Sequence, residues 1–127
     1  MSSFSDYLEN AVLNHVFRNT SLASPASVWL ALYTALPTDA GGGTQVSGGG
    51  YARQQITFGP PSGGTISNTS AVSFTASGAS FGTVVGVAIF DASTGGNFLA
   101  WDDIASAVIN DGDTLTFPIG NINLSIT

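Results

Sequence analysis

The chain has no cysteine and no lysine, and it has only one histidine and two arginines among its 127 residues. Without cysteine, neither disulfide bonds nor thiolate metal sites can form, and redox chemistry gives no indication of the compartment. Few side chains are therefore able to transfer a proton, attack a substrate or ligate a metal. We expect a protein that is not an enzyme, needs no cofactor and acts through its surfaces.

Positive charge is especially scarce, because Arg18 and Arg53 stand against eight acidic residues and the net charge is −6. Binding to nucleic acid or to an anionic membrane surface needs clustered Lys and Arg, which this chain lacks. No apolar run is long enough for a membrane-spanning helix, and the N-terminal segment lacks the basic start of a signal peptide. The sequence predicts a protein made in the cytoplasm, with no nucleic-acid or membrane partner.

Apolar and small polar residues make up most of the chain. The hydrophobic content of 43% is sufficient for the core of one domain at this length. Only 8% of the residues are charged, whereas roughly 25% is typical of soluble domains. Because such a surface offers little charge repulsion between identical copies, it suits assembly into a homo-oligomer.

A helix is predicted near the start of the chain, over about residues 4–19. Apolar positions recur there at helical spacing, Ser5 can cap the first turn, and Asp6 and Glu9 suit the helix dipole. The apolar positions are Phe4, Leu8, Ala11, Val12, Leu13, Val16 and Phe17. A stripe this broad must be covered, either by the helix's own domain or by a neighbouring subunit, and the sequence leaves both arrangements open.

Short strands separated by turn-forming residues are predicted for the rest of the chain. Residues 28–33 are apolar at every position, which predicts a central strand covered on both faces. Further strands are expected at about residues 52–58, 65–67, 71–75, 83–90, 97–101, 107–109, 114–117 and 122–126. The fold class predicted is mainly β: residues 1–127 as a single antiparallel β-sandwich domain, with a jelly roll as one form of it, and one N-terminal helix.

Six glycines between positions 41 and 50 predict a long exposed loop over about residues 36–50. The loop lacks the Lys-Ser/Thr ending and the strand-to-helix setting of a phosphate-binding loop. Because loops of this length are commonly functional or mobile, it is a candidate contact surface.

Acidic residues cluster only at Asp102-Asp103 and at Asp111-Gly-Asp113. Paired carboxylates can act as the acid and base of a glycosidase or as calcium ligands, but the calcium-loop spacing is absent. Residues 110–113 are typical of a hairpin turn whose polar side chains bond their own backbone. At His15, we expect a hydrogen-bonded interior imidazole rather than a metal ligand.

Aromatic residues offer a possible sugar-stacking platform, formed by Trp29, Tyr33, Tyr51, Phe90 and Trp101. All but Tyr51 fall within predicted strands, where core packing is the usual role. Trp101, at a predicted strand end beside Asp102, is the best candidate for a glycan contact.

Three segments resemble small virion proteins of tailed bacteriophages, which are described as tail-fibre-like or minor structural proteins. They are residues 7–17 together with the strand that follows at 25–38, residues 46–54 and residues 89–99. The most distinctive block is Ser47-Gly-Gly-Gly-Tyr-Ala-Arg53, and the resemblance extends over nearly the whole chain.

The resemblance implies a structural role in the virion and brings no catalytic residues. Within the virion, we expect a capsid decoration (cement) protein bound to the major capsid protein, because a compact domain lacks the repetitive shaft of a complete fibre. The alternative is a tail or tail-fibre component, with receptor or glycan binding. Expected partners are the major capsid protein or other virion proteins and further copies of the chain. Candidate interface residues are Phe4, Tyr7, Leu8, Val12, Phe17, Gly48, Gly49, Gly50, Tyr51 and Arg53.

Overall fold

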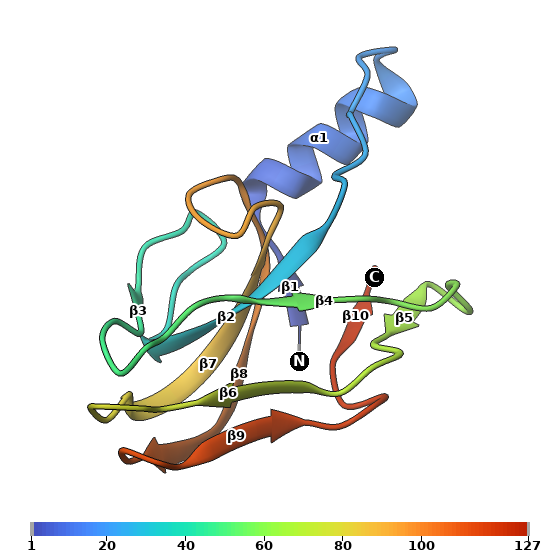
Figure 1. Ribbon diagram of the computed structural model, residues 1–127. Coiled ribbons are helices and arrows are strands. Elements are labelled where there is room, and N and C mark those ends of the chain that lie inside the picture. The colour runs from blue at the N-terminus through green and yellow to red at the C-terminus, as the bar shows by residue number, and fades with distance from the viewer. Residues whose placement is uncertain (1, 127) are drawn as a thin grey trace.

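The computed structural model describes residues 2–126 and is mainly β, with one helix near the N-terminus (Figure 1). The elements are β1 (Ser2–Phe4), α1 (Asp6–Phe17), β2 (Val28–Ala35), β3 (Thr44–Gln45), β4 (Gln54–Ile56), β5 (Thr65–Ser67), β6 (Val72–Thr75), β7 (Gly82–Phe90), β8 (Phe98–Ile109), β9 (Thr114–Phe117) and β10 (Asn123–Ser125). Antiparallel sheets with a single helix confirm the predicted fold class.

The largest sheet has six strands in the order β1-β8-β7-β2-β3, and β4 also pairs with β2. β2 and β7 pair along their length, with Trp29 opposite Phe90 and Tyr33 opposite Gly86. The side of β2 away from β7 is shared between two short strands, β4 at residues 28–30 and β3 at residues 33–35. β2 lies inside the sheet because both of its faces are apolar.

The main core fills the space between this sheet and two shorter strand pairs, β6–β9 and β5–β10. Alternate residues of β2 point into it, and both Leu30 and Leu32 are fully buried. From the opposite layer, the Phe74 ring on β6 meets the Phe117 ring on β9 edge to face, with centroids 6.3 Å apart. Figure 1 shows β6 and β9 running together across from β7 and β8.

The other face of the six-stranded sheet carries a smaller apolar cluster. It consists of Ala31, Tyr33, Ala88 and Phe90, with Phe98 and Trp101 packed against it. Individual side chains cover parts of this face, since the Arg53 guanidinium lies 3.7 Å from the Phe90 ring centroid. Trp101 donates from Nε1 to the Asp39 carboxylate at 2.9 Å.

Several local features differ from the sequence predictions. Phe4 belongs to β1 rather than to the helix, because residues 2–4 pair with β8 and Ser5 then caps α1. The strands expected at residues 97–101 and 107–109 form one strand, β8, so Trp101 is not at its C-terminal end. His15 is exposed and not interior, and its Nδ1 accepts a hydrogen bond from the Leu22 backbone N–H at 3.1 Å.

The turn at residues 110–113 is not a hairpin, because β8 belongs to the large sheet whereas β9 pairs only with β6 among the described strands. Asp113 bonds the turn's own backbone, as the sequence predicted, by accepting from the Asn110 N–H at 2.9 Å. Asp111 instead accepts from the Gly78 N–H, outside the turn, also at 2.9 Å. The glycine-rich segment at residues 36–50 contains β3 and includes the buried residues Pro37, Val46 and Gly49.

The helix of the described residues spans 12 positions, too short to cross a membrane.

Candidate functional site

The first candidate surface is α1, which leads away from the sandwich (Figure 1). Its N-terminal end is held firmly, because Ser5 donates from its backbone N–H to the Leu99 carbonyl at 2.8 Å and from Oγ to the Phe98 carbonyl at 2.6 Å. The same Oγ accepts from the Leu8 N–H at 3.1 Å as the helix cap. None of the residues of α1 is buried. The helix is therefore anchored at its base, and its C-terminal half is largely exposed.

An apolar stripe on α1 is exposed at its C-terminal half. Leu13, Val16 and Phe17 are 54%, 61% and 76% exposed, and their spacing places them on one side of the helix. We call these three residues the outer stripe. Of the helix candidates named from the sequence, only Phe17 belongs to it.

The remaining N-terminal candidates lie elsewhere. Leu8 is partly buried and packs against the main core. Val12 is half-buried, Tyr7 is exposed, and Phe4 is half-buried in β1. Leu13 and Val16 were part of the apolar pattern, but the pattern alone did not show which side the fold would leave open.

Tyr51 is the first member of a second candidate region, the segment that follows the glycines. Its ring stacks on Phe74 and meets Phe81 edge to face, with centroids 6.2 and 5.9 Å away. Its hydroxyl accepts from the Leu32 N–H at 3.1 Å and donates to Gln45 Oε1 at 2.7 Å. Leu32 lies between the parts of β2 that pair with β3 and β4. The Tyr51 hydroxyl therefore accepts from a backbone N–H that neither of these strands reaches. Burial raises the pKa of Tyr51 to about 12, so the hydroxyl keeps its proton at neutral pH.

Arg53 is the second member of this region and joins it to the loop between β7 and β8. Its Nε donates to Gln45 Oε1 at 3.0 Å, and its Nη1 donates to the carbonyls of Ala92 and Gly95 at 2.9 and 2.8 Å. The guanidinium also stacks on Phe90. All of these partners are neutral, and across residues 4–126 no carboxylate forms an ion pair with Arg53.

A surface groove of about 340 Å³ opens beside Tyr51 and Arg53. It is lined by Gln45, Val46, Tyr51, Ala52, Arg53, Ser93, Thr94 and Gly95. The sequence singled out Tyr51 and Arg53 but not their neighbours, because the loop at residues 91–97 meets this segment only in the folded chain.

The glycines at positions 48–50 do not line this groove. Gly48 and Gly50 are exposed, whereas Gly49 is buried with a φ of 58°. A Cβ at Gly49 would lie 2.6 Å from the Ala79 carbonyl oxygen. Gly49 is therefore required by close packing of the backbone.

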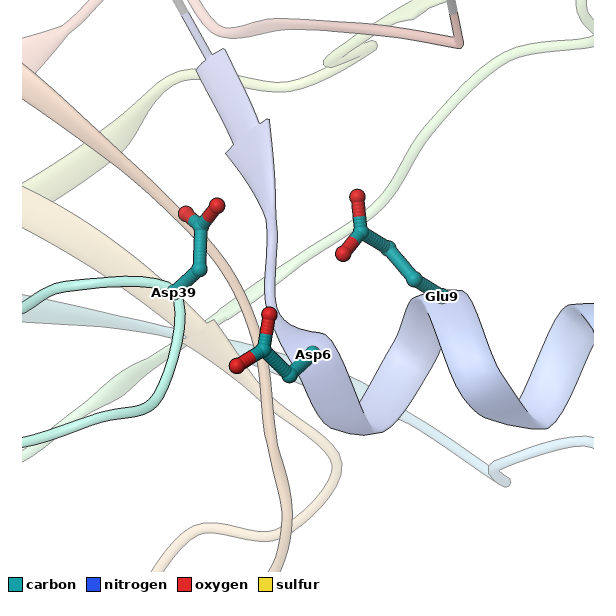
Figure 2. A group of neighbouring side chains, drawn as sticks. All are labelled: Asp6, Glu9 and Asp39. Carbon is teal, nitrogen blue, oxygen red and sulfur yellow. The ribbon is translucent and has the colours of Figure 1, made fainter.

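Three carboxylates gather where α1 begins, Asp6 and Glu9 from the helix and Asp39 from the loop before β3 (Figure 2). Their oxygen atoms lie within 4.8 Å of one another, and such ligands suit a hard cation. The fold also accounts for them directly, because the helix dipole favours acids at this end and Asp39 accepts from Trp101 Nε1. Nothing in the sequence placed Asp39 beside the helix.

The acidic residues considered for catalysis lie beside a small cavity, at Asp102, or bond to backbone groups, at Asp111 and Asp113. Burial raises the pKa of Asp102, and the nearby Asp103 carboxylate acts in the same direction. The cavity beside Asp102 has a volume of about 50 Å³, whereas small-molecule sites commonly measure roughly 300–1,000 Å³. Asp111 and Asp113 bond to backbone N–H groups of turns.

Comparison with known protein families gives a match over residues 3–125 to the family described as Podophage GP4 fiber I protein gp80. No curated protein matches the chain. The match confirms the resemblance to phage virion structural proteins. A phage fibre family is not a known enzyme class, and it implies association with other virion proteins. Since the match covers nearly the whole sequence, the chain belongs to the family of Podophage GP4 fiber I protein gp80, a family of structural fibre proteins of the phage virion.

Proposed function

We propose that the protein is a subunit of a phage tail fibre and that the outer stripe of α1 attaches it to another virion protein. The observation that carries this proposal is the exposure of Leu13, Val16 and Phe17 on a helix whose base alone is tied to the sandwich. Exposed apolar surface of this kind commonly marks a contact with another protein.

The outer stripe is large enough for a useful contact but not for a tight one by itself. Complete burial of a Val, Leu or Phe side chain contributes about 1.5–3 kcal/mol. Since each of the three is more than half exposed, their burial would contribute on the order of 4 kcal/mol. A net binding free energy of that size corresponds to about millimolar affinity, and the loss of translational and rotational freedom on association makes the stripe alone weaker still. Several copies attached to one fibre would bind far more strongly through multivalency.

Capsid decoration, which the sequence suggested first, would use the same stripe with a different partner, the major capsid protein. The description of the matched family as a fibre protein favours the fibre assignment.

Cryo-electron microscopy of purified particles would test the assignment directly. We expect density for this chain in a tail fibre, with the outer stripe of α1 covered by a neighbouring protein. A chain found on the capsid lattice would support the decoration alternative and overturn the fibre assignment.

A pair of matched variants tests the role of the stripe. Phe17→Ser should lower the amount of this chain in purified particles, because it removes the most exposed member of the stripe. Ile119→Ser is the control, since Ile119 is 69% exposed but lies in the loop between β9 and β10. Equal incorporation of both variants would contradict attachment through α1.

A further inference from the structure

We infer that the groove beside Arg53 binds an acidic saccharide, through one sugar unit that carries a single carboxylate. The site is distinct from α1, and nothing in the fibre assignment requires it. Only the biological source of the saccharide, a bacterial surface polymer, rests on the proposed fibre function.

The cation in this groove is fixed in place before any ligand arrives. Three hydrogen bonds and the Phe90 ring hold the Nε and Nη1 side of the Arg53 guanidinium. Its Nη2 donates to none of the residues at positions 4–126. A guanidinium held in this way loses little conformational entropy when an anion accepts hydrogen bonds from its remaining N–H groups.

The local charge of the groove is opposite to that of the whole protein. None of the residues that line it is acidic. Asp91, in the adjoining loop, has its carboxylate occupied by the backbone N–H and side-chain amide of Asn97, at 2.7 and 2.9 Å. Because these donors are neutral, Asp91 keeps its charge, but it forms no ion pair with Arg53. A concave lining of one sign attracts ligands of the other.

The remaining lining suits a hydroxylated ring. The hydroxyls of Ser93 and Thr94 and the Gln45 side-chain N–H₂ group bond to no described residue, so each is available to a ligand. Val46 and Ala52 add apolar surface to the same groove. A sugar ring matches this combination, because its hydroxyls are polar whereas its C–H faces are apolar. The volume of about 340 Å³ lies within the range of small-molecule sites.

The charge of the rest of the chain limits the ligand to few charges. With a net charge of −6, the protein repels polyanions such as nucleic acid at low ionic strength. A single carboxylate on a neutral, hydroxyl-rich ring pairs with Arg53 and meets the least repulsion.

Titration of the isotope-labelled chain by NMR, at low salt, tests the inference with three probes: sodium glucuronate, glucose and glucose 6-phosphate. We expect glucuronate to shift backbone amides at residues 45–53 and 92–96, and to bind at least about tenfold more tightly than glucose, as a charge-assisted hydrogen bond would give. Absence of shifts in those segments, or equal binding of glucose, would overturn the inference. Tighter binding of glucose 6-phosphate would overturn the choice of a carboxylate.

The variant Thr94→Glu keeps Arg53 and its structural contacts and places a competing carboxylate in the groove. Thr94 is exposed and makes no hydrogen bond to a described residue, so the fold should be retained. We expect glucuronate affinity to fall about tenfold, by loss of the pairing with Arg53. Ser106→Glu, which adds the same charge at an exposed position of β8 outside the groove, should bind as the wild type does. Equal affinities for all three proteins would contradict binding at Arg53.

The two proposals fail separately. A chain that binds glucuronate but lies outside the fibres would overturn the proposed function alone. A chain that lies in the fibres through α1 but gives no glucuronate shifts would overturn the saccharide site alone.

Discussion

α1 and the segment from Gly48 to Arg53 were both candidate contact surfaces, and the fold uses them in different ways. Tyr51 and Arg53 direct most of their hydrogen bonds inward, to Leu32, Gln45 and the loop after β7. The outer stripe of α1, in contrast, is mostly exposed. The distinctive block at residues 47–53 is therefore used mainly to hold the fold together. The open surface is provided by α1, whose apolar sequence is ordinary.

Substitution of Tyr51 should give the largest loss of stability, and so the clearest difference between the two regions. Because its ring packs between two core phenylalanines, Tyr51→Ala should lower the free energy of unfolding by about 3–5 kcal/mol. Tyr51→Phe should cost about 1–3 kcal/mol, since the Leu32 N–H loses its partner. Urea unfolding measures both losses. A loss below about 1 kcal/mol for Tyr51→Ala would show that this segment does not stabilise the fold.

Arg53→Ala should be the next most destabilising change, by about 2–3 kcal/mol, because two carbonyls lose a charged donor and Phe90 loses its stacked guanidinium. Hydrogen exchange at residues 91–97 should accelerate at the same time. The chain's other arginine provides the control. Arg18→Ala removes only an exposed bond to Asn14 and should change stability by less than about 0.5 kcal/mol.

Ser5→Ala tests the anchor of α1 and should cost about 1–2 kcal/mol, through loss of the helix cap and of the bond to β8. Circular dichroism during thermal unfolding should show helix signal lost before strand signal. Simultaneous loss of both signals at an unchanged midpoint would argue against a base-only anchor.

Alkaline pH should weaken the Tyr51 region selectively. Since burial raises the pKa of Tyr51 from 10.0 to about 12, the folded state holds this proton more tightly than the unfolded state does. The resulting stability is complete below pH 10 and is lost as the pH rises towards about 12. Burial also raises the pKa of Tyr33, so Tyr51→Phe should reduce the fall in stability without abolishing it. Denaturation midpoints across this range measure the slope for each protein.

Phe17→Ser should have the smallest effect on the isolated chain, within about 0.5 kcal/mol, because the side chain is already 76% exposed. A larger loss of stability in thermal unfolding would mean that the outer stripe packs on its own chain. Variants in the outer stripe and at Tyr51 would then both lower stability, and the difference between the two regions would disappear.

Much of the fold followed from local patterns. β5 and β9 have the predicted bounds, and Ser5 caps the helix as expected, because turn residues, alternation and capping act over a few neighbouring positions.

The tertiary structure alone decided which distant residues meet. β1 pairs with β8 almost a hundred positions away, which moved Phe4 out of the helix. Arg53 reaches Ala92 and Gly95, and Asp39 reaches Trp101, through the register of the large sheet. Local sequence determined the elements, whereas the groove, the acidic cluster and the open side of α1 depend on contacts between segments far apart in the chain, which local spacing does not encode.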